Sequence, residues 1–143
     1  MRVYFIFDIK DEFVNLYNGN ERALFNILRQ IYLMNNYEVE YGYNLFNQLI
    51  NRVNKSDLDR YIYLKFHQSI PYSKRGDIHI YNNLYRDEIS RLTVKKTYIR
   101  LESEQVISSF FSILNIYNKN YFVCEFKYQE CFFLSSKCNV SKT

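Results

Sequence analysis

The passage from strand to helix that sets the fold is predicted over residues 9–21, which read IKDEFVNLYNGNE. The apolar run just before it, residues 3–7, is typical of a central β-strand. Residues 11–18 then have the composition of a short helix, and Gly19 stands where a helix commonly ends in the left-handed conformation. We therefore expect a strand, a tight turn and a short helix at the start of the chain.

Two large aromatic side chains, Phe13 and Tyr17, lie four residues apart on this short helix, which places both rings on one face. Such a pair usually packs into a core. However, a helix this short cannot bury every side, and Val14 supplies an inward residue on a different face. We interpret the two rings as outward-facing contacts for another protein, with core packing as the alternative.

Farther along, helical periodicity of apolar residues predicts three longer helices, over residues 20–36, 43–53 and 56–66. Ser56 and Asp59 form a capping pattern at the start of the last of these. The only proline, Pro71, marks a break, and residues 72–76 are predicted to be a polar loop.

The second half of the chain changes to strand-like alternation. A helix capped by Ser103, with Glu104 in its first turn, is expected after the first strands. The predicted strands cover residues 77–81, 88–94, 97–101, 121–128 and 131–134. This order predicts an α/β fold with a mostly antiparallel sheet flanked by helices.

The length of 143 residues suits a single domain, which we place at residues 1–135, with a flexible C-terminal tail at residues 136–143. Aromatic residues make up 19% of the chain, and AT-rich coding DNA explains that enrichment without a functional cause. We find no signal-peptide core and no apolar run long enough to span a membrane, so we expect a cytoplasmic protein with no membrane partner.

The sequence indicates neither a catalytic centre nor a metal site. His67 and His79 fall on separate elements, and Cys124, Cys131 and Cys138 are seven residues apart, which is not the close pairing that zinc requires. An odd number of cysteines in the cytosol favours free thiols. We predict no catalytic residues, no cofactor and no metal.

Charge patterning leaves one alternative. The net charge is +4, and basic residues are scattered, with the densest group between Arg91 and Arg100, including Lys95 and Lys96. A nucleic-acid-binding protein usually gathers basic residues on one face. This pattern does not favour direct nucleic-acid binding, and the alternative is a weakly basic nucleic-acid-binding accessory protein that uses these four residues.

Residues 9–21 resemble the start of the SirA family, the sporulation inhibitors of replication. The shared pattern is Ile-Lys-x-Glu-Phe-x-Asn-x-Tyr-x-Gly-x-Glu, matched by Ile9, Lys10, Glu12, Phe13, Asn15, Tyr17, Gly19 and Glu21. The resemblance continues to residue 28 and is weakest over residues 53–72.

The resemblance implies a non-enzymatic inhibitor that binds the N-terminal domain of the replication initiator DnaA. In the family, a Phe and a Tyr of the first helix contact that domain, and a Gln of a later helix completes the surface. By position these are Phe13, Tyr17 and Gln48, with Asn47 as the alternative for the amide. The family also implies a trimmed GNAT (acetyltransferase-like) fold.

An acyltransferase is the enzymatic alternative, and it needs a glycine-rich turn that holds the phosphates of a coenzyme at a helix N-terminus. Gly19, Gly42 and Gly76 form no such pattern. The expected position, just before Glu104, carries the acidic Glu102, which would repel phosphate. We therefore predict a fold without the coenzyme site.

Overall fold

The computed structural model describes residues 1–34, 39–104 and 108–139. Over these ranges the strands are β1 (Arg2–Asp8), β2 (Tyr72–Arg75), β3 (Ile78–Asn83), β4 (Glu88–Val94), β5 (Ile99–Ser103), β6 (Tyr121–Glu125) and β7 (Glu130–Phe133). The helices are α1 (Asp11–Tyr17), α2 (Glu21–Leu33), α3 (Val39–Leu49), α4 (Lys55–Phe66), α5 (Ser109–Tyr117) and α6 (Leu134–Asn139).

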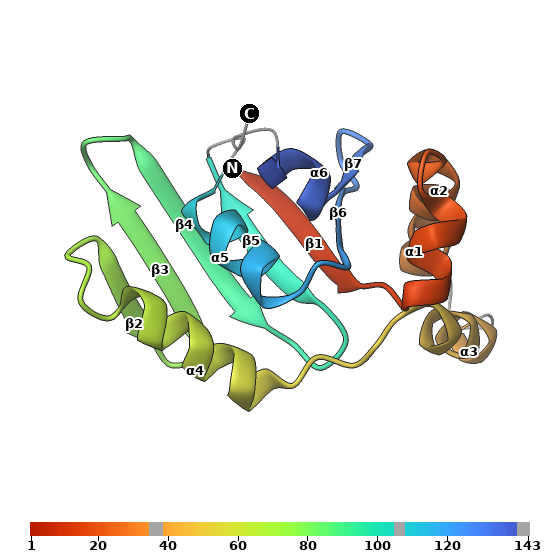
Figure 1. Ribbon diagram of the computed structural model, residues 1–143, viewed down its shortest axis with the longest axis horizontal. Coiled ribbons are helices and arrows are strands. Elements are labelled where there is room, and N and C mark those ends of the chain that lie inside the picture. Colours follow the sequence, from red (N-terminus) through yellow and green to blue (C-terminus); the bar gives the residue numbers. More distant parts are fainter. Residues whose placement is uncertain (35–38, 105–107, 140–143) are drawn as a thin grey trace.

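All seven strands form one antiparallel sheet in the order β2-β3-β4-β5-β1-β6-β7. Strand β1 pairs with β5 on one side and with β6 on the other, so the first strand of the chain lies inside the sheet (Figure 1). The predicted α/β fold with a mostly antiparallel sheet flanked by helices is confirmed.

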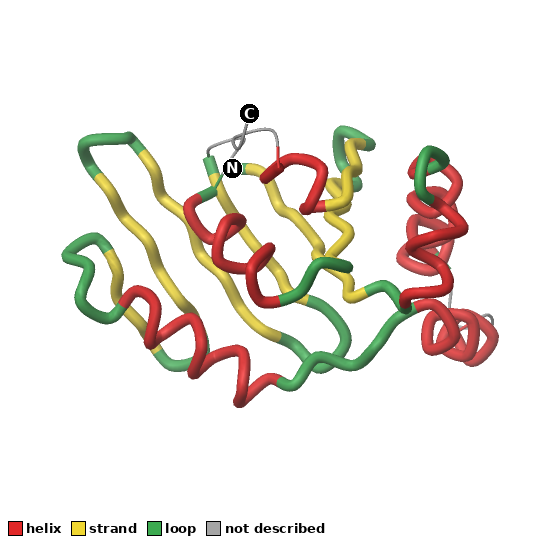
Figure 2. Tube along the Cα trace, viewed as in Figure 1, coloured by secondary structure: helices red, strands yellow, loops and turns green. Residues whose placement is uncertain are grey.

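Alternation along β1 directs side chains into two separate cores. Tyr4 and Ile6 lie in the first core, which α4, α5 and α6 cover. Phe5 and Phe7 lie against the second core, which α1, α2 and α3 cover. The second group of helices stands at one end of the sheet, and residues 50–54 run from α3 to α4 (Figure 2).

The predicted capping signals hold at one helix and fail at two others. Gly19 follows the C-cap of α1 with a φ of 84°, as expected for a left-handed helix end. Asn54, not Ser56, caps α4, because its side chain accepts a hydrogen bond from the Asp57 backbone N–H. Ser103 was also expected to cap a helix, but it is a buried residue of β5.

Helix α5 begins five residues later than the sequence predicted, with Ser108 as its N-cap. Glu104 therefore lies outside its first turn. The negative charge at this helix start comes instead from Glu88 of β4, which is 4% exposed. Its carboxylate accepts hydrogen bonds from Ser109 N (2.9 Å), Ser109 Oγ (2.6 Å) and Ser90 Oγ (2.8 Å).

Two further segments differ from expectation. Tyr72–Arg75, predicted as a loop, forms the edge strand β2 and pairs with β3. Helix α6 occupies residues 134–139, so regular structure extends into the segment assigned to the tail, while residues 140–143 lie outside the described residues.

A buried histidine ties β3 to α4 and β2. His79 is fully buried, with Nε2 at 2.7 Å from Asp59 Oδ1 and Nδ1 at 2.8 Å from the Tyr72 hydroxyl oxygen. A neutral ring satisfies both contacts, because Nε2–H donates to Asp59 and Nδ1 accepts from Tyr72. Burial lowers the pKa of His79 and outweighs the opposite effect of Asp59.

We predict that Glu88→Ala lowers the free energy of unfolding by about 3 kcal/mol, since it removes a buried carboxylate that accepts several hydrogen bonds. Urea unfolding measures this change. Glu104→Ala is the matched control, and its effect should stay below about 0.5 kcal/mol because Glu104 is exposed. Equal effects of the two changes would contradict the role assigned to Glu88.

We also predict that acid weakens the fold through His79. The unfolded chain takes up the proton near the ordinary pKa of 6.5, whereas folded His79 resists it until lower pH. Stability is therefore complete above pH 6.5 and is lost as pH falls below that value. Unfolding free energies at about pH 7.5 and about pH 5.5 should differ less in His79→Gln than in the wild type. His67→Gln, which changes an exposed histidine, should keep the wild-type difference.

Candidate partner-binding site

Backbone hydrogen bonds hold the start of α1 beside the end of α3. Lys10 N donates to Leu49 O at 3.0 Å, and Asn51 N donates to Asp8 O at 2.8 Å. An isolated antiparallel bridge joins Ile9 to Ile50 between them. Two segments about 40 residues apart in sequence thus meet at one place, where Figure 1 shows α1 and α3 as neighbours.

The two predicted aromatic residues lie at the boundary between core and solvent. No residue of α1 is fully buried. Phe13 and Tyr17 are both half-buried and pack against the second core together with Val14. The structure thus matches neither a fully buried pair nor a freely exposed one, and part of each ring stays accessible.

Leu16 extends this surface and was missed in the sequence analysis. It is 64% exposed, and it follows Phe13 by three residues, so the two side chains share one side of α1. The i, i+3, i+4 spacing of Phe13, Leu16 and Tyr17 was the available signal. We define these three residues as the α1 surface.

The two amide candidates at the end of α3 differ in their surroundings. Asn47 is half-buried, and its side chain hydrogen-bonds to the Tyr43 hydroxyl. That bond, with a second from Arg52, lowers the pKa of Tyr43. Gln48 is exposed and directly precedes Leu49, whose carbonyl accepts from Lys10. Gln48 is therefore the more accessible of the two amides.

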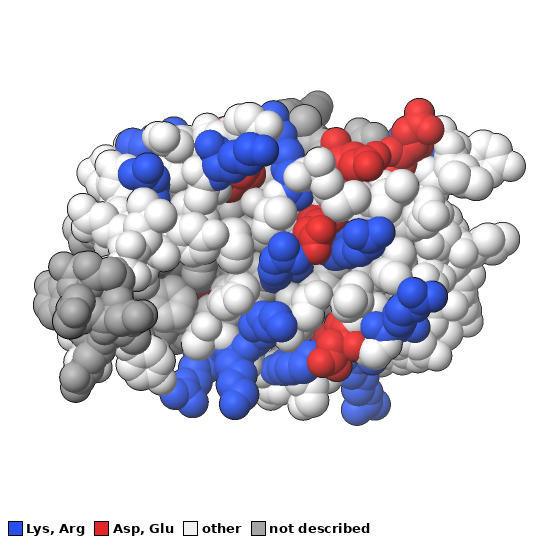
Figure 3. All heavy atoms as spheres, turned by 180° about the vertical axis from the view of Figure 1, so that it is seen from behind, with Lys and Arg blue, Asp and Glu red and all other residues white. Residues whose placement is uncertain are grey.

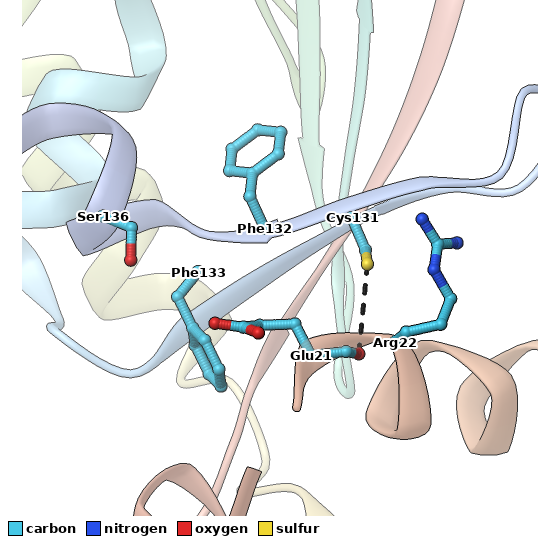
Figure 4. Close-up of a pocket in the computed structure, with 6 residues that line it drawn as sticks. All are labelled: Glu21, Arg22, Cys131, Phe132, Phe133 and Ser136. Atoms are coloured by element: carbon cyan, nitrogen blue, oxygen red, sulfur yellow. Dashed lines mark hydrogen bonds between the residues drawn. The ribbon is translucent and has the colours of Figure 1, made fainter. Parts of the chain in front are cut away.

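A pocket of about 300 Å³ lies elsewhere, between the start of α2, β7 and α6 (Figure 4). Its lining includes Glu21, Arg22 and Cys131, and the Cys131 thiol lies 3.9 Å from the backbone oxygen of Glu21. Arg22 already donates to Gln129 O at 2.7 Å. Burial raises the pKa of the Cys131 thiol, which keeps it protonated and a poor nucleophile.

The cysteines behave as predicted where they are described. Cys124 is buried and Cys131 is half-buried, and both are free thiols although they lie opposite each other on β6 and β7. The side chain of Cys138 lies outside the described residues. Among the described residues, no group of three or more His, Cys, Asp or Glu side chains could hold a metal ion.

The start of α5 is where the acyltransferase alternative would place coenzyme phosphate. There the Glu88 carboxylate already accepts from Ser109 N, and Ser108 Oγ accepts from Phe110 N at 3.2 Å. A phosphate would have to displace a buried carboxylate of like charge. Glu102, predicted to repel phosphate at this helix start, lies instead within β5, and the carboxylate at the start of α5 belongs to Glu88.

Comparison with known families supports the resemblance carried by residues 9–21. A family model described as sporulation inhibitor of replication protein SirA matches residues 2–137, nearly the whole chain. A search of curated proteins found no match. None of the helices within residues 1–34, 39–104 and 108–139 is long and apolar enough to cross a membrane.

The half-buried rings should contribute modestly to stability. We predict that Phe13→Ala and Tyr17→Ala each lower the free energy of unfolding by about 1–2 kcal/mol, less than the loss of a fully buried aromatic residue. Leu16→Ala should change it by less than about 0.5 kcal/mol, because the side chain is mostly exposed. Thermal and urea unfolding measure all three, and a loss above about 4 kcal/mol at either ring would instead assign it to the core.

Proposed function

Because this chain belongs to the SirA family of sporulation inhibitors of replication, we propose that it binds the N-terminal domain of the initiator DnaA. The contact is made by the α1 surface and Gln48. The observation that carries this proposal is the accessible apolar strip formed by Phe13, Leu16 and Tyr17 on a helix with no fully buried residue.

The chemistry of this strip suits a small protein interface. Aromatic side chains at the edge of a core bury apolar area on binding and lose little conformational entropy, because the core already restricts them. An exposed amide beside them fixes the orientation of the partner through hydrogen bonds. The hydrogen bond from Lys10 N to Leu49 O at 3.0 Å supports a pre-arranged spacing between the rings and Gln48.

The mechanism we propose is steric competition. A protein that occupies the N-terminal domain of DnaA blocks the self-association of that domain or its contacts with helicase and activators. Initiation then falls without a covalent step, so the proposal makes the chain a non-enzymatic regulator that acts in the cytoplasm. The likeness to a trimmed GNAT fold without the coenzyme site stays a prediction.

The local charge refines the expected partner surface. Asp11 and Glu12 are exposed in the first turn of α1, and the last turn has no basic residue. The partner surface should therefore be polar or basic around an apolar depression, although the chain as a whole carries +4.

Titration of the full chain against the isolated N-terminal domain of DnaA from the same cell tests the proposal. We expect Phe13→Ala, Tyr17→Ala and Leu16→Ala each to weaken binding by about tenfold or more, since truncated interface anchors typically cost over 1 kcal/mol. Gln48→Ala should weaken binding more than Asn47→Ala does.

Ile116→Ala is the matched control for Leu16→Ala, because Ile116 is 74% exposed on α5, the helix that covers the opposite face of the sheet. It should bind as the wild type does. Absence of binding by the folded wild type, or equal weakening by Leu16→Ala and Ile116→Ala, would contradict the proposal.

A further inference from the structure

Among the described residues, the helices that pack on the second face of the sheet lie at one end of it, against β1, β6 and β7. In β4, Leu92 and Val94 lie in the first core, so Arg91 and Thr93 point to the opposite face. The second core includes no residue of β2, β3 or β4. We call the second face of strands β2–β5 the open face. Figure 3 looks onto this face, because it views the molecule from the side opposite to that of Figure 1.

Basic side chains gather on the part of the open face nearest the β4–β5 turn. Arg75 pairs in register with Ile78, and Arg100 with Thr93, so both arginines lie on this face. Arg91 occupies the next row, opposite Ile80. Lys95 and Lys96 are exposed in the adjoining turn, and Lys and Arg side chains are spread over this side of the molecule (Figure 3).

Acidic residues on the same face are fewer, although Glu102 lies among the basic residues. Glu102 bonds to Arg100 and is opposite Arg91, and Glu104 follows at the end of β5. Four of the five basic residues, from Arg91 to Arg100, already form the densest basic group of the sequence. Pairing of β2 with β3 and of β3 with β4 adds Arg75 to them.

An aromatic group borders the basic region directly. Phe5 of β1 is in register with Arg100, and its ring lies 5.7 Å from that of Tyr98 and 5.5 Å from that of Tyr32. Tyr32 stacks on Phe126 at 4.6 Å and is nevertheless 56% exposed. An accessible ring, already fixed by stacking, thus adjoins a cationic surface.

We propose that the open face binds single-stranded nucleic acid, with Arg75, Arg91, Lys95 and Lys96 contacting phosphates and Tyr32 stacking on a base. Cationic surfaces combined with accessible aromatic rings are the usual means of binding single strands without sequence preference. Stacking of Tyr32 on a base requires that base to be unpaired, which favours a single strand over a duplex.

An acidic protein segment would pair with the cations equally well, but its carboxylates would not stack on the exposed Tyr32 ring. The open face is also separate from the α1 surface, since it is built on strands β2–β5 and α1 packs on the second core. The proposal therefore stands or falls independently of DnaA binding.

Fluorescence anisotropy tests the proposed binding of single-stranded nucleic acid. A labelled oligothymidylate of about 15 nucleotides is titrated with the full chain at about 20 mM and about 200 mM salt. We expect binding that weakens steeply with salt. Arg75→Gln with Arg91→Gln, and separately Lys95→Gln with Lys96→Gln, should each reduce the salt slope by about 1.4, as two lost single-strand phosphate contacts imply.

The control is Lys65→Gln with Lys119→Gln, which removes the same charge from exposed residues of α4 and the α5–β6 turn. Tyr32→Ala should weaken binding about fivefold or more, as loss of one stacked base implies, whereas Tyr85→Ala, in the exposed β3–β4 turn, should not. Because the Lys95 and Lys96 changes lie in a turn, they test the surface even if the strand variants fail to fold.

Three results would overturn the proposal. They are no anisotropy change at low salt, an equal loss of oligonucleotide affinity in the control variant, and displacement of the oligonucleotide by polyglutamate as effectively as by unlabelled oligothymidylate. Tighter binding of a duplex than of the single strand would also overturn it.

Discussion

The fold depends on the burial of β1 on both faces of the sheet. Tyr4 and Ile6 face one core while Phe5 and Phe7 face the other, and the strand is paired along both edges. Such a strand has one acceptable register, because a shift by one residue would exchange its two faces. The point at which the chain leaves β1 is therefore fixed, and with it the position of α1.

That fixed exit also explains how a seven-residue helix keeps a defined position. An isolated helix of this length is not stable in water, so packing must hold α1 in place. Packing of Phe13, Val14 and Tyr17 against the second core supplies part of this, and the bond from Lys10 N to Leu49 O supplies another part. The same rings that hold the helix also remain partly accessible.

Sequence periodicity was sufficient for elements with a clear apolar pattern. Strand β1, the buried residues Leu24 and Leu28 of α2, and the helix end at Gly19 follow directly from spacing. Strand β2 was not predicted, because an edge strand with only one partly buried residue shows no alternation of apolar and polar residues.

Features that depend on long-range contacts could not be predicted. The start of α5 is set by Glu88 from a strand some 20 residues earlier, and no local signal marks that carboxylate as its partner. The candidate site shows the same division. Phe13 and Tyr17 follow from helical spacing, whereas the meeting of α1 with the end of α3, the helix that carries Gln48, requires the pairing of Ile9 with Ile50.

The proposed contact with the DnaA N-terminal domain consists of the α1 surface and the end of α3. Hydrogen–deuterium exchange of the full chain, with and without that domain, tests it most directly. The account predicts slower exchange over residues 11–18 and 47–51, with residues 72–94 unchanged. Protection confined to residues 72–94, with α1 exchanging as in the free chain, would contradict it.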